Sequence, residues 1–230
     1  MNYIKDNIID INKNIKESIQ KANREDNVTL IAVTKTVDID KIQIAINNGI
    51  TDVGENKAQE LDRKFKIIGN DVRWHLIGSL QTNKVRYIID KVYMIHSLDR
   101  ISLCEEIQKR AEKINRNINC LVQVNISREE TKQGVYIEEV EAFIKEVSKN
   151  YKNIKIQGLM TMAPFTDNHE EIRSVFERLK KLSLDIDNLG IKDVEMKNLS
   201  MGMSNDYELA IEEGATMIRV GTSIFGKRNY

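Results

Sequence analysis

The chain has 230 residues, of which 35 are basic and 35 are acidic, so its formal net charge at pH 7 is zero. This balance excludes the basic excess on which nucleic-acid-binding and membrane-surface proteins depend. No apolar run reaches the roughly 18 residues of a membrane-spanning helix, and the N-terminus has the pattern of neither a signal peptide nor a transit peptide.

The two cysteines, Cys104 and Cys120, have neither CxxC nor Cys/His spacing. Cys104 shares a helical stripe with apolar residues and is expected to pack in the core. The cysteines therefore argue against a disulfide framework and against a zinc site. We expect a cytoplasmic protein with one domain over residues 1–230.

The predicted elements begin with a helix over residues 3–23, where isoleucines at spacings of three and four form one face. Short apolar segments then alternate with amphipathic ones. Strands are expected at 29–34, 51–55, 72–78, 92–98, 119–126, 154–162, 197–204 and 217–226. Helices are expected at 39–48 (with Asp38 as N-cap), 58–68, 84–89, 100–115, 137–148, 170–184 and 205–213.

Eight strands that alternate with helices predict parallel pairing with right-handed crossovers. The fold class we predict is α/β, a single (β/α)8 TIM barrel with an extra N-terminal helix. The alternative is a doubly wound open sheet. Its usual GxGxxG fingerprint is absent, because the first strand is followed by the sequence TKTVD at 34–38.

In such a barrel the functional residues lie at the carboxyl ends of the strands. Lys35 ends the first strand, where a desolvated amine is suited to forming a Schiff base, although a lysine there can also extend into water. The segments 200–206 and 219–223 place small and hydroxyl residues at the last two strand ends. Together they favour a phosphate site over ordinary helix-capping turns.

Arg219 lies two residues before Gly221, on the same face of its strand, and could reach the other end of a ligand whose phosphate is held near Gly221. It could instead be a buried ion-pair partner, for example of Glu55. The three histidines, His75, His96 and His169, show no metal-ligand spacing, so no metal site is expected.

Several of these segments in combination resemble the pyridoxal 5′-phosphate (PLP) homeostasis proteins, the YggS/PROSC family, along essentially the whole chain. The segments are AVTK (32–35), VGEN (53–56), WHLIGSLQTNK (74–84), GLM (158–160), LSMGMSND (199–206) and IRVGT (218–222). This family is similar to the N-terminal barrel domain of alanine racemases, which agrees with the predicted fold.

The resemblance implies that Lys35 carries PLP covalently as a Schiff base. It also implies that the phosphate is bound by Ser204, Gly221 and Thr222, and that Arg219 faces the pyridine nitrogen. Asn56 and His75 belong to family motifs near the ring, and we count them as cofactor-binding residues too.

The implied function is PLP binding in intracellular vitamin B6 homeostasis, without catalytic turnover. An arginine at the pyridine nitrogen leaves it unprotonated, which weakens the ring as an electron sink. The chain ends at Tyr230, so the β-domain of the racemases is expected to be absent. The alternatives are a low-activity amino-acid racemase and a Schiff-base aldolase. Expected partners are PLP and PLP-dependent apoenzymes, with no nucleic acid and no membrane, and we expect a monomer.

Overall fold

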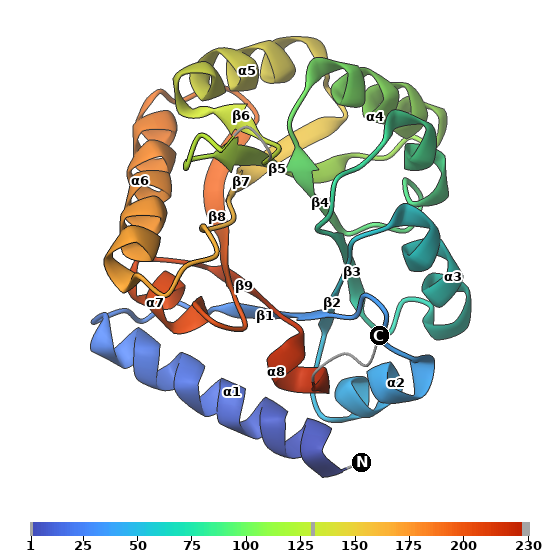
Figure 1. Cartoon of the computed structure of the whole chain (residues 1–230). Coiled ribbons are helices and arrows are strands. Elements are labelled where there is room, and N and C mark those ends of the chain that lie inside the picture. Colours follow the sequence, from blue (N-terminus) through green and yellow to red (C-terminus); the bar gives the residue numbers. More distant parts are fainter. Residues whose placement is uncertain (1, 130–131, 227–230) are drawn as a thin grey trace.

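The computed structural model describes residues 2–129 and 132–226, and Figure 1 shows a closed ring of strands surrounded by helices. The expected chain end at Tyr230 lies outside the described residues. The strands of the ring are β1 (Thr29–Val33), β2 (Asp52–Glu55), β3 (Arg73–Leu76), β4 (Met94–Leu98), β5 (Ile118–Asn125), β7 (Ile154–Met160), β8 (Val194–Met203) and β9 (Met217–Val220).

Each strand of the ring pairs in parallel with both neighbours, and the pairs β1–β9 and β4–β5 close it. Closure confirms the predicted eight-stranded barrel, and it makes the open-sheet alternative wrong. A short strand that we did not predict, β6 (Val135–Tyr136), pairs with the end of β5 outside the ring.

The helices lie around the outside of the ring, as expected for crossovers between parallel strands (Figure 1). They are α1 (Asn2–Lys21), α2 (Ile39–Asn47), α3 (Ala58–Ile68), α4 (Ile101–Lys113), α5 (Ile137–Asn150), α6 (His169–Asn188), α7 (Tyr207–Glu212) and α8 (Thr222–Phe225), with the 3-10 helix η1 (Thr82–Tyr87) between β3 and β4.

Two predicted elements differ from the structure. The helix expected at 84–89 is the 3-10 helix η1, because this short segment closes with bonds such as Lys84 N–H to Gln81 O, three residues apart. The strand expected over 217–226 ends at Val220. Gly221 O then accepts hydrogen bonds from the backbone N–H groups of Ile224 and Phe225, which turns the β-branched sequence TSIF into helix α8.

Asp38 occupies the predicted N-cap position of α2, but its side chain makes no capping hydrogen bond. In the described part of the chain, no helix has the length and apolar character needed to span a membrane.

The hydrophobic core has two parts. The larger one fills the layer between the strands and the surrounding helices. The smaller one lies inside the ring and consists of Ile31, Met94, Leu121, Met160 and Met217. Buried polar side chains accompany them, and those of His75, His96, Ser200 and Arg219 contact one another across the strands.

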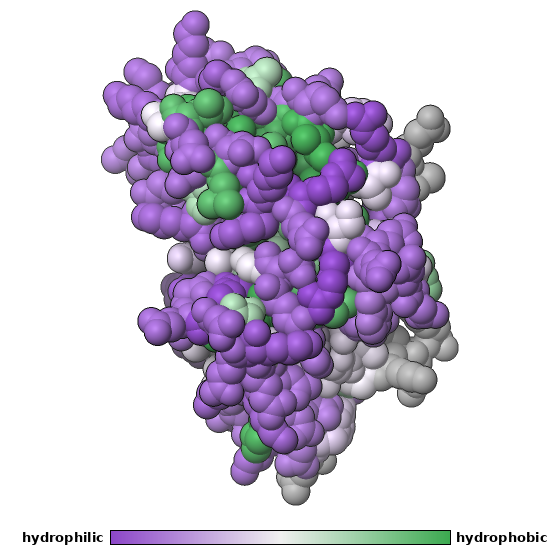
Figure 2. Space-filling model, turned by 90° about the vertical axis from the view of Figure 1, so that its left-hand side faces the viewer, coloured by the Kyte–Doolittle hydropathy of each residue, from purple (hydrophilic) through white to green (hydrophobic). Residues whose placement is uncertain are grey.

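Outer surfaces of the helices are mainly polar. Figure 2 shows a face that is largely hydrophilic, with hydrophobic side chains gathered in the upper part of the view. The two free cysteines, Cys104 and Cys120, are both buried, as the helical stripe around Cys104 predicted.

Candidate functional site

The predicted site residues fall into two groups. Lys35, Asn56, Ser204, Gly221 and Thr222 follow the carboxyl ends of β1, β2, β8 and β9, at the mouth of the barrel. Arg219 and His75 lie within β9 and β3 and are buried. The mouth and the interior directly below it therefore form the candidate site.

Lys35 is half-buried in a tight turn that directly follows β1. The N–H of Val37 donates to Thr34 O at 2.9 Å and closes this turn. Thr36 has a φ of 62°, a left-handed conformation that is strained for a β-branched residue. Strain of this kind persists only where the surrounding structure imposes it, and it is concentrated at functional sites.

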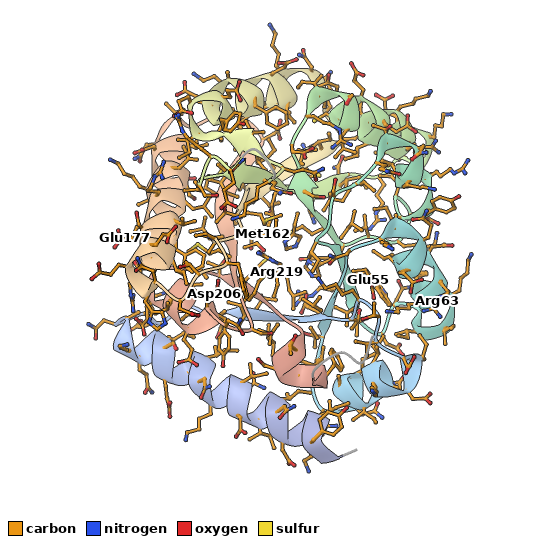
Figure 3. The ribbon with its side chains drawn as sticks, in the orientation of Figure 1. Glu55, Arg63, Met162, Glu177, Asp206 and Arg219 are labelled. Atoms are coloured by element: carbon orange, nitrogen blue, oxygen red, sulfur yellow. The ribbon has the colours of Figure 1, made fainter. Side chains whose placement is uncertain are left out.

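A buried ion pair supports this turn from outside the ring. Lys64 of α3 donates to Glu55 Oε1 at 2.6 Å and to the carbonyl oxygen of Thr34 at 2.7 Å, and the side chains of Lys64 and Glu55 are fully buried. The Thr34 hydroxyl donates to the same oxygen of Glu55 at 2.6 Å. Figure 3 shows Glu55 on the side of β2 that faces α3.

This contact settles one alternative reading of the sequence. Glu55 pairs with Lys64, so it is not the ion-pair partner of Arg219. The acid that acts electrostatically on Arg219 is Asp206, at the end of β8.

The ends of β8 and β9 form a small cradle of backbone donors. The N–H groups of Gly221 and Ser223 both point to Ser204 Oγ, at 3.2 and 3.4 Å. A Cβ atom on Gly221 would lie 3.2 Å from Val33 Cβ, so glycine permits the close approach of the two strand ends. Thr222 is exposed as the first residue of α8, directly at this cradle.

The segment before Ser204 is held in a fixed shape. Gly202 has a φ of 90°, and a Cβ there would lie 2.6 Å from Ala210 Cβ. Asp206 accepts a hydrogen bond from the Met203 N–H at 2.5 Å, and burial raises the pKa of its carboxyl group. Both contacts fix the turn that presents Ser204.

Asn56 lies beside a second close backbone contact. A Cβ on Gly78 would approach Asn56 O to 2.4 Å, so the chain after β3 is pressed against the chain after β2. Asn56 itself is half-buried, and its side chain makes no hydrogen bond to the rest of the described residues. Its amide can therefore hydrogen-bond a ligand at the mouth.

Arg219 extends from β9 into the ring (Figure 3). Its guanidinium donates to Ser200 Oγ at 2.6 Å and to the carbonyl oxygen of Thr161 at 2.9 Å. Burial lowers the pKa of Arg219 to about 10, so the group stays charged at neutral pH. Within the residues that the structure describes, these two bonds use two of its five N–H groups.

A chain of hydrogen bonds continues from Ser200 across the barrel interior. Ser200 Oγ lies 2.9 Å from His96 Nδ1, His96 Nε2 lies 2.9 Å from His75 Nδ1, and His75 Nε2 lies 2.9 Å from Asp52 Oδ1. Asp52 also accepts from Arg73 at 2.7 Å. Both ring nitrogens of His75 thus contact protein atoms, and any role of His75 towards a ligand is indirect.

Burial governs the protonation of these groups. Burial, together with the neighbouring His75 and Arg219, holds the pKa of His96 well below its usual value. Burial also lowers the pKa of His75, although the carboxylate of Asp52 opposes this. For Asp52, burial opposes ionisation, but hydrogen bonds from His75, Arg73 and Thr51 outweigh it and lower the pKa.

Sequence reasoning missed that these residues contact one another. Ser200 was placed at a strand end and His96 was considered as a metal ligand, Asp52 was not singled out, and no pattern in the sequence linked them. The available signal was polarity: three strands carry a histidine or acid at positions that alternate with buried apolar residues. In the described residues no group of three or more His, Cys, Asp or Glu side chains could hold a metal ion, although His75 and His96 are in contact.

Comparison with known proteins identifies relatives along the whole chain. The family model of the alanine racemase N-terminal domain matches residues 7–229. A pyridoxal phosphate homeostasis protein of Aquifex aeolicus is 43% identical over 218 residues, which cover 94% of each chain. One from Pseudomonas aeruginosa is 36% identical over 232 residues, covering 100% of this chain and 98% of the relative.

Comparison with solved structures also finds relatives along most of the chain. An unknown protein from Bifidobacterium adolescentis is 34% identical with a TM-score of 0.92, covering 97% of this chain and 94% of that one. PipY of Synechococcus elongatus is 31% identical and has been solved without PLP (TM-score 0.86, 97% of this chain and 100% of that one) and with PLP bound (TM-score 0.81, 92% and 100%). An alanine racemase of Clostridium difficile, 15% identical with a TM-score of 0.78, shares the fold; the chain covers 58% of it.

Proposed function

The chain belongs to the pyridoxal phosphate homeostasis protein family, which is built on the alanine racemase N-terminal domain, and from this we propose that it binds PLP and serves in PLP homeostasis. The observation that carries the proposal is the cradle at the ends of β8 and β9. There two backbone N–H groups converge on one oxygen, Ser204 Oγ, as they would on a phosphate oxygen.

The residues at the mouth fit the remaining parts of the cofactor. PLP has an aldehyde, a phosphate and a pyridine nitrogen, and it withdraws electrons from amines bound at its aldehyde. Lys35 is the amine to which the aldehyde is attached. Ser204, Gly221 and Thr222 bind the phosphate, and Arg219 donates a hydrogen bond to the ring nitrogen. Asn56 contributes its side-chain amide at the edge of the pyridine ring. His75 lies below the mouth of the barrel and acts on the cofactor indirectly.

Arg219 supports a non-catalytic role. A guanidinium that stays charged at neutral pH donates hydrogen bonds and does not give up its proton. A ring nitrogen that accepts from it stays unprotonated, which limits electron withdrawal. Residues 1–230 form one PLP-binding barrel domain that carries or buffers PLP for apoenzymes. The face shown in Figure 2 is largely polar, which supports a monomer, and two buried free cysteines support a cytoplasmic location.

The test is to titrate the purified chain with PLP and to reduce the complex with borohydride. We expect a yellow complex and a reduced adduct on Lys35 by peptide mass mapping. Lys35→Ala should lose the adduct. Lys66→Ala is the matched control, because Lys66 lies on the exposed face of α3 and should leave the adduct unchanged.

The phosphate contacts are tested in the same titration with pyridoxal as a second ligand. Ser204→Ala should weaken PLP binding by about tenfold or more, because a hydrogen bond to a charged group contributes about 1.5–3 kcal/mol. Pyridoxal should bind this variant and the wild type equally. Ser148→Ala on α5 is the control for loss of a serine hydroxyl. An adduct on another lysine, or equal losses of PLP and pyridoxal, would contradict the assignment.

A further inference from the structure

When both histidines are neutral, as their burial favours, the polar chain inside the barrel has one possible direction. Its two ends are Arg219, which can only donate hydrogen bonds, and the carboxylate of Asp52, which can only accept them. The three groups between them must therefore each accept from the Arg219 side and donate towards Asp52.

This assignment fixes every proton along the chain. Ser200 accepts from Arg219, so its hydroxyl donates to His96 Nδ1. His96 then carries its proton on Nε2 and donates to His75 Nδ1, and His75 carries its proton on Nε2 and donates to Asp52. Both rings are thus neutral Nε2–H tautomers, in agreement with their complete burial.

The chain also reaches most of the barrel wall. Asp52, His75, His96, Ser200 and Arg219 belong to β2, β3, β4, β8 and β9, and Arg219 continues to the carbonyl oxygen that follows β7. The Arg219 guanidinium is bonded to Ser200 Oγ and to the carbonyl oxygen of Thr161, and Ser200 is itself held by the fully bonded chain. The guanidinium therefore has one orientation. A fully satisfied polar network in a core specifies such an arrangement.

We propose that Ser200, His96 and His75 are positioning residues that hold the Arg219 guanidinium as a hydrogen-bond donor of fixed orientation towards the ring nitrogen of PLP. The proposal rests on the proposed function, which places that nitrogen at Arg219. It assigns His75 a role three hydrogen bonds away from Arg219. It also explains why a barrel interior, normally filled by branched apolar side chains, carries a polar chain here.

The direction of the chain can be tested without PLP. Nitrogen-15 NMR of the full chain should show the rings of His75 and His96 as neutral Nε2–H tautomers at pH 7.5, with His169→Gln used to assign the third histidine. The guanidinium N–H signals of Arg219 should be resolved and slow to exchange. An imidazolium or an Nδ1–H tautomer at either buried ring would overturn the proposal.

The effect on the cofactor is tested with variants that break the chain at increasing distance from Arg219. Ser200→Ala should shift the absorption maximum of bound PLP and weaken PLP binding by about tenfold. His96→Asn should cause a smaller change in the same direction, and His75→Asn a smaller one again. Ser183→Ala is the matched control, because it removes another buried serine hydroxyl, on α6 outside the ring.

A purely structural role of the chain predicts a different result. The variants would then lower the melting temperature but leave the absorption of bound PLP as in the wild type, and this outcome would overturn the proposal. If a variant does not fold, the tautomer measurement on the wild type still decides. A wild type that shows the expected tautomers but binds no PLP would contradict the proposed function, and with it the role of the chain towards the cofactor.

Discussion

His75 and His96 are the residues in which burial has the clearest thermodynamic consequence. His75 is surrounded by Asp52, Arg73 and the ring of Tyr93. His96 is next to Ser200 and Arg219. In the folded chain both pKa values lie below the ordinary value of about 6.5, which the unfolded chain retains. At mildly acidic pH the unfolded chain therefore binds more protons than the folded one, and stability falls as the pH falls.

The first prediction concerns this pH window. Between pH 7.5 and 5.5 the free energy of unfolding should decrease, by up to about 2–3 kcal/mol, because both histidines bind protons less readily in the folded chain than in the unfolded one. Urea unfolding at intervals of half a pH unit measures this. His96→Gln should reduce the decrease by about half. The matched variant His169→Gln, at the exposed start of α6, should leave it unchanged, and an equal effect of both variants would contradict the assignment.

The residues of the mouth could be predicted from the sequence, and those below it could not. Lys35 follows a predicted strand, Ser204 is the last residue of another and Gly221 lies in the last predicted strand, and strand ends meet at one edge of a barrel. The contact between His75 and His96 depends on which side chains point inwards and on how far neighbouring strands are staggered. Two single histidines 21 positions apart in the sequence reveal neither the direction of their side chains nor the stagger of their strands.

At the scale of elements, the contact between α3 and the first two strands fixes the position of the turn that carries Lys35. Lys64 lies on the buried face of α3 between Leu61 and Ile68. A lysine on an apolar helical stripe signals a buried partner, and here that partner is Glu55 at the end of β2. Through the carboxylate of Glu55, this pair connects α3 and β2 to Thr34, the residue before Lys35.

The second prediction tests this contact. Lys64→Met leaves the carboxylate of Glu55 buried without its counter-charge, so the free energy of unfolding should fall by about 3–5 kcal/mol. The double variant Glu55→Gln/Lys64→Met should recover most of the loss, because the amide oxygen still accepts from the Thr34 hydroxyl and no charge remains.

Lys66→Met is the control for this series. Lys66 lies two residues further along α3 with an exposed ion pair to Asp62, and its loss should cost less than about 1 kcal/mol. Chemical denaturation of the four proteins provides the comparison. A double variant as unstable as Lys64→Met would show that lost packing, and not the unpaired charge, causes the effect.

Element types were predicted well where a segment was long enough to show a hydrophobic period, and poorly where the segment was short. The isoleucine face of α1 extends from Ile4 to Ile19 and could be recognised at once. The segments TNKVRY and TSIF are each too short to display a period, and tertiary contacts decide their conformation. For TSIF, the decisive contact is the hydrogen bond from Gly221 N–H to Ser204 Oγ, which ends β9.

At the scale of the whole molecule, α1 connects the start of the described chain with its last two helices. Figure 1 shows it lying along the outside of the ring beside α7 and α8. Asn7 donates to the carbonyl oxygen of Ile224 at 3.0 Å, and Asn14 donates to the hydroxyl of Tyr207 at 3.0 Å. The first helix thus holds the last one, whose first residue is Thr222 in the proposed phosphate site.

The last prediction uses two adjacent isoleucines of α1, of which Ile8 is 2% exposed and Ile9 is 55% exposed. Ile8→Ala should lower the free energy of unfolding by about 2–4 kcal/mol, because it removes buried methyl groups and leaves a cavity. Ile9→Ala should change it by less than about 0.5 kcal/mol. Because α1 holds α8, hydrogen exchange at the amides of Ile224 and Phe225 should accelerate in Ile8→Ala more than at amides of the distant helix α4. Equal acceleration at both helices would indicate global destabilisation only, and it would contradict a specific coupling between the first helix and the proposed phosphate site.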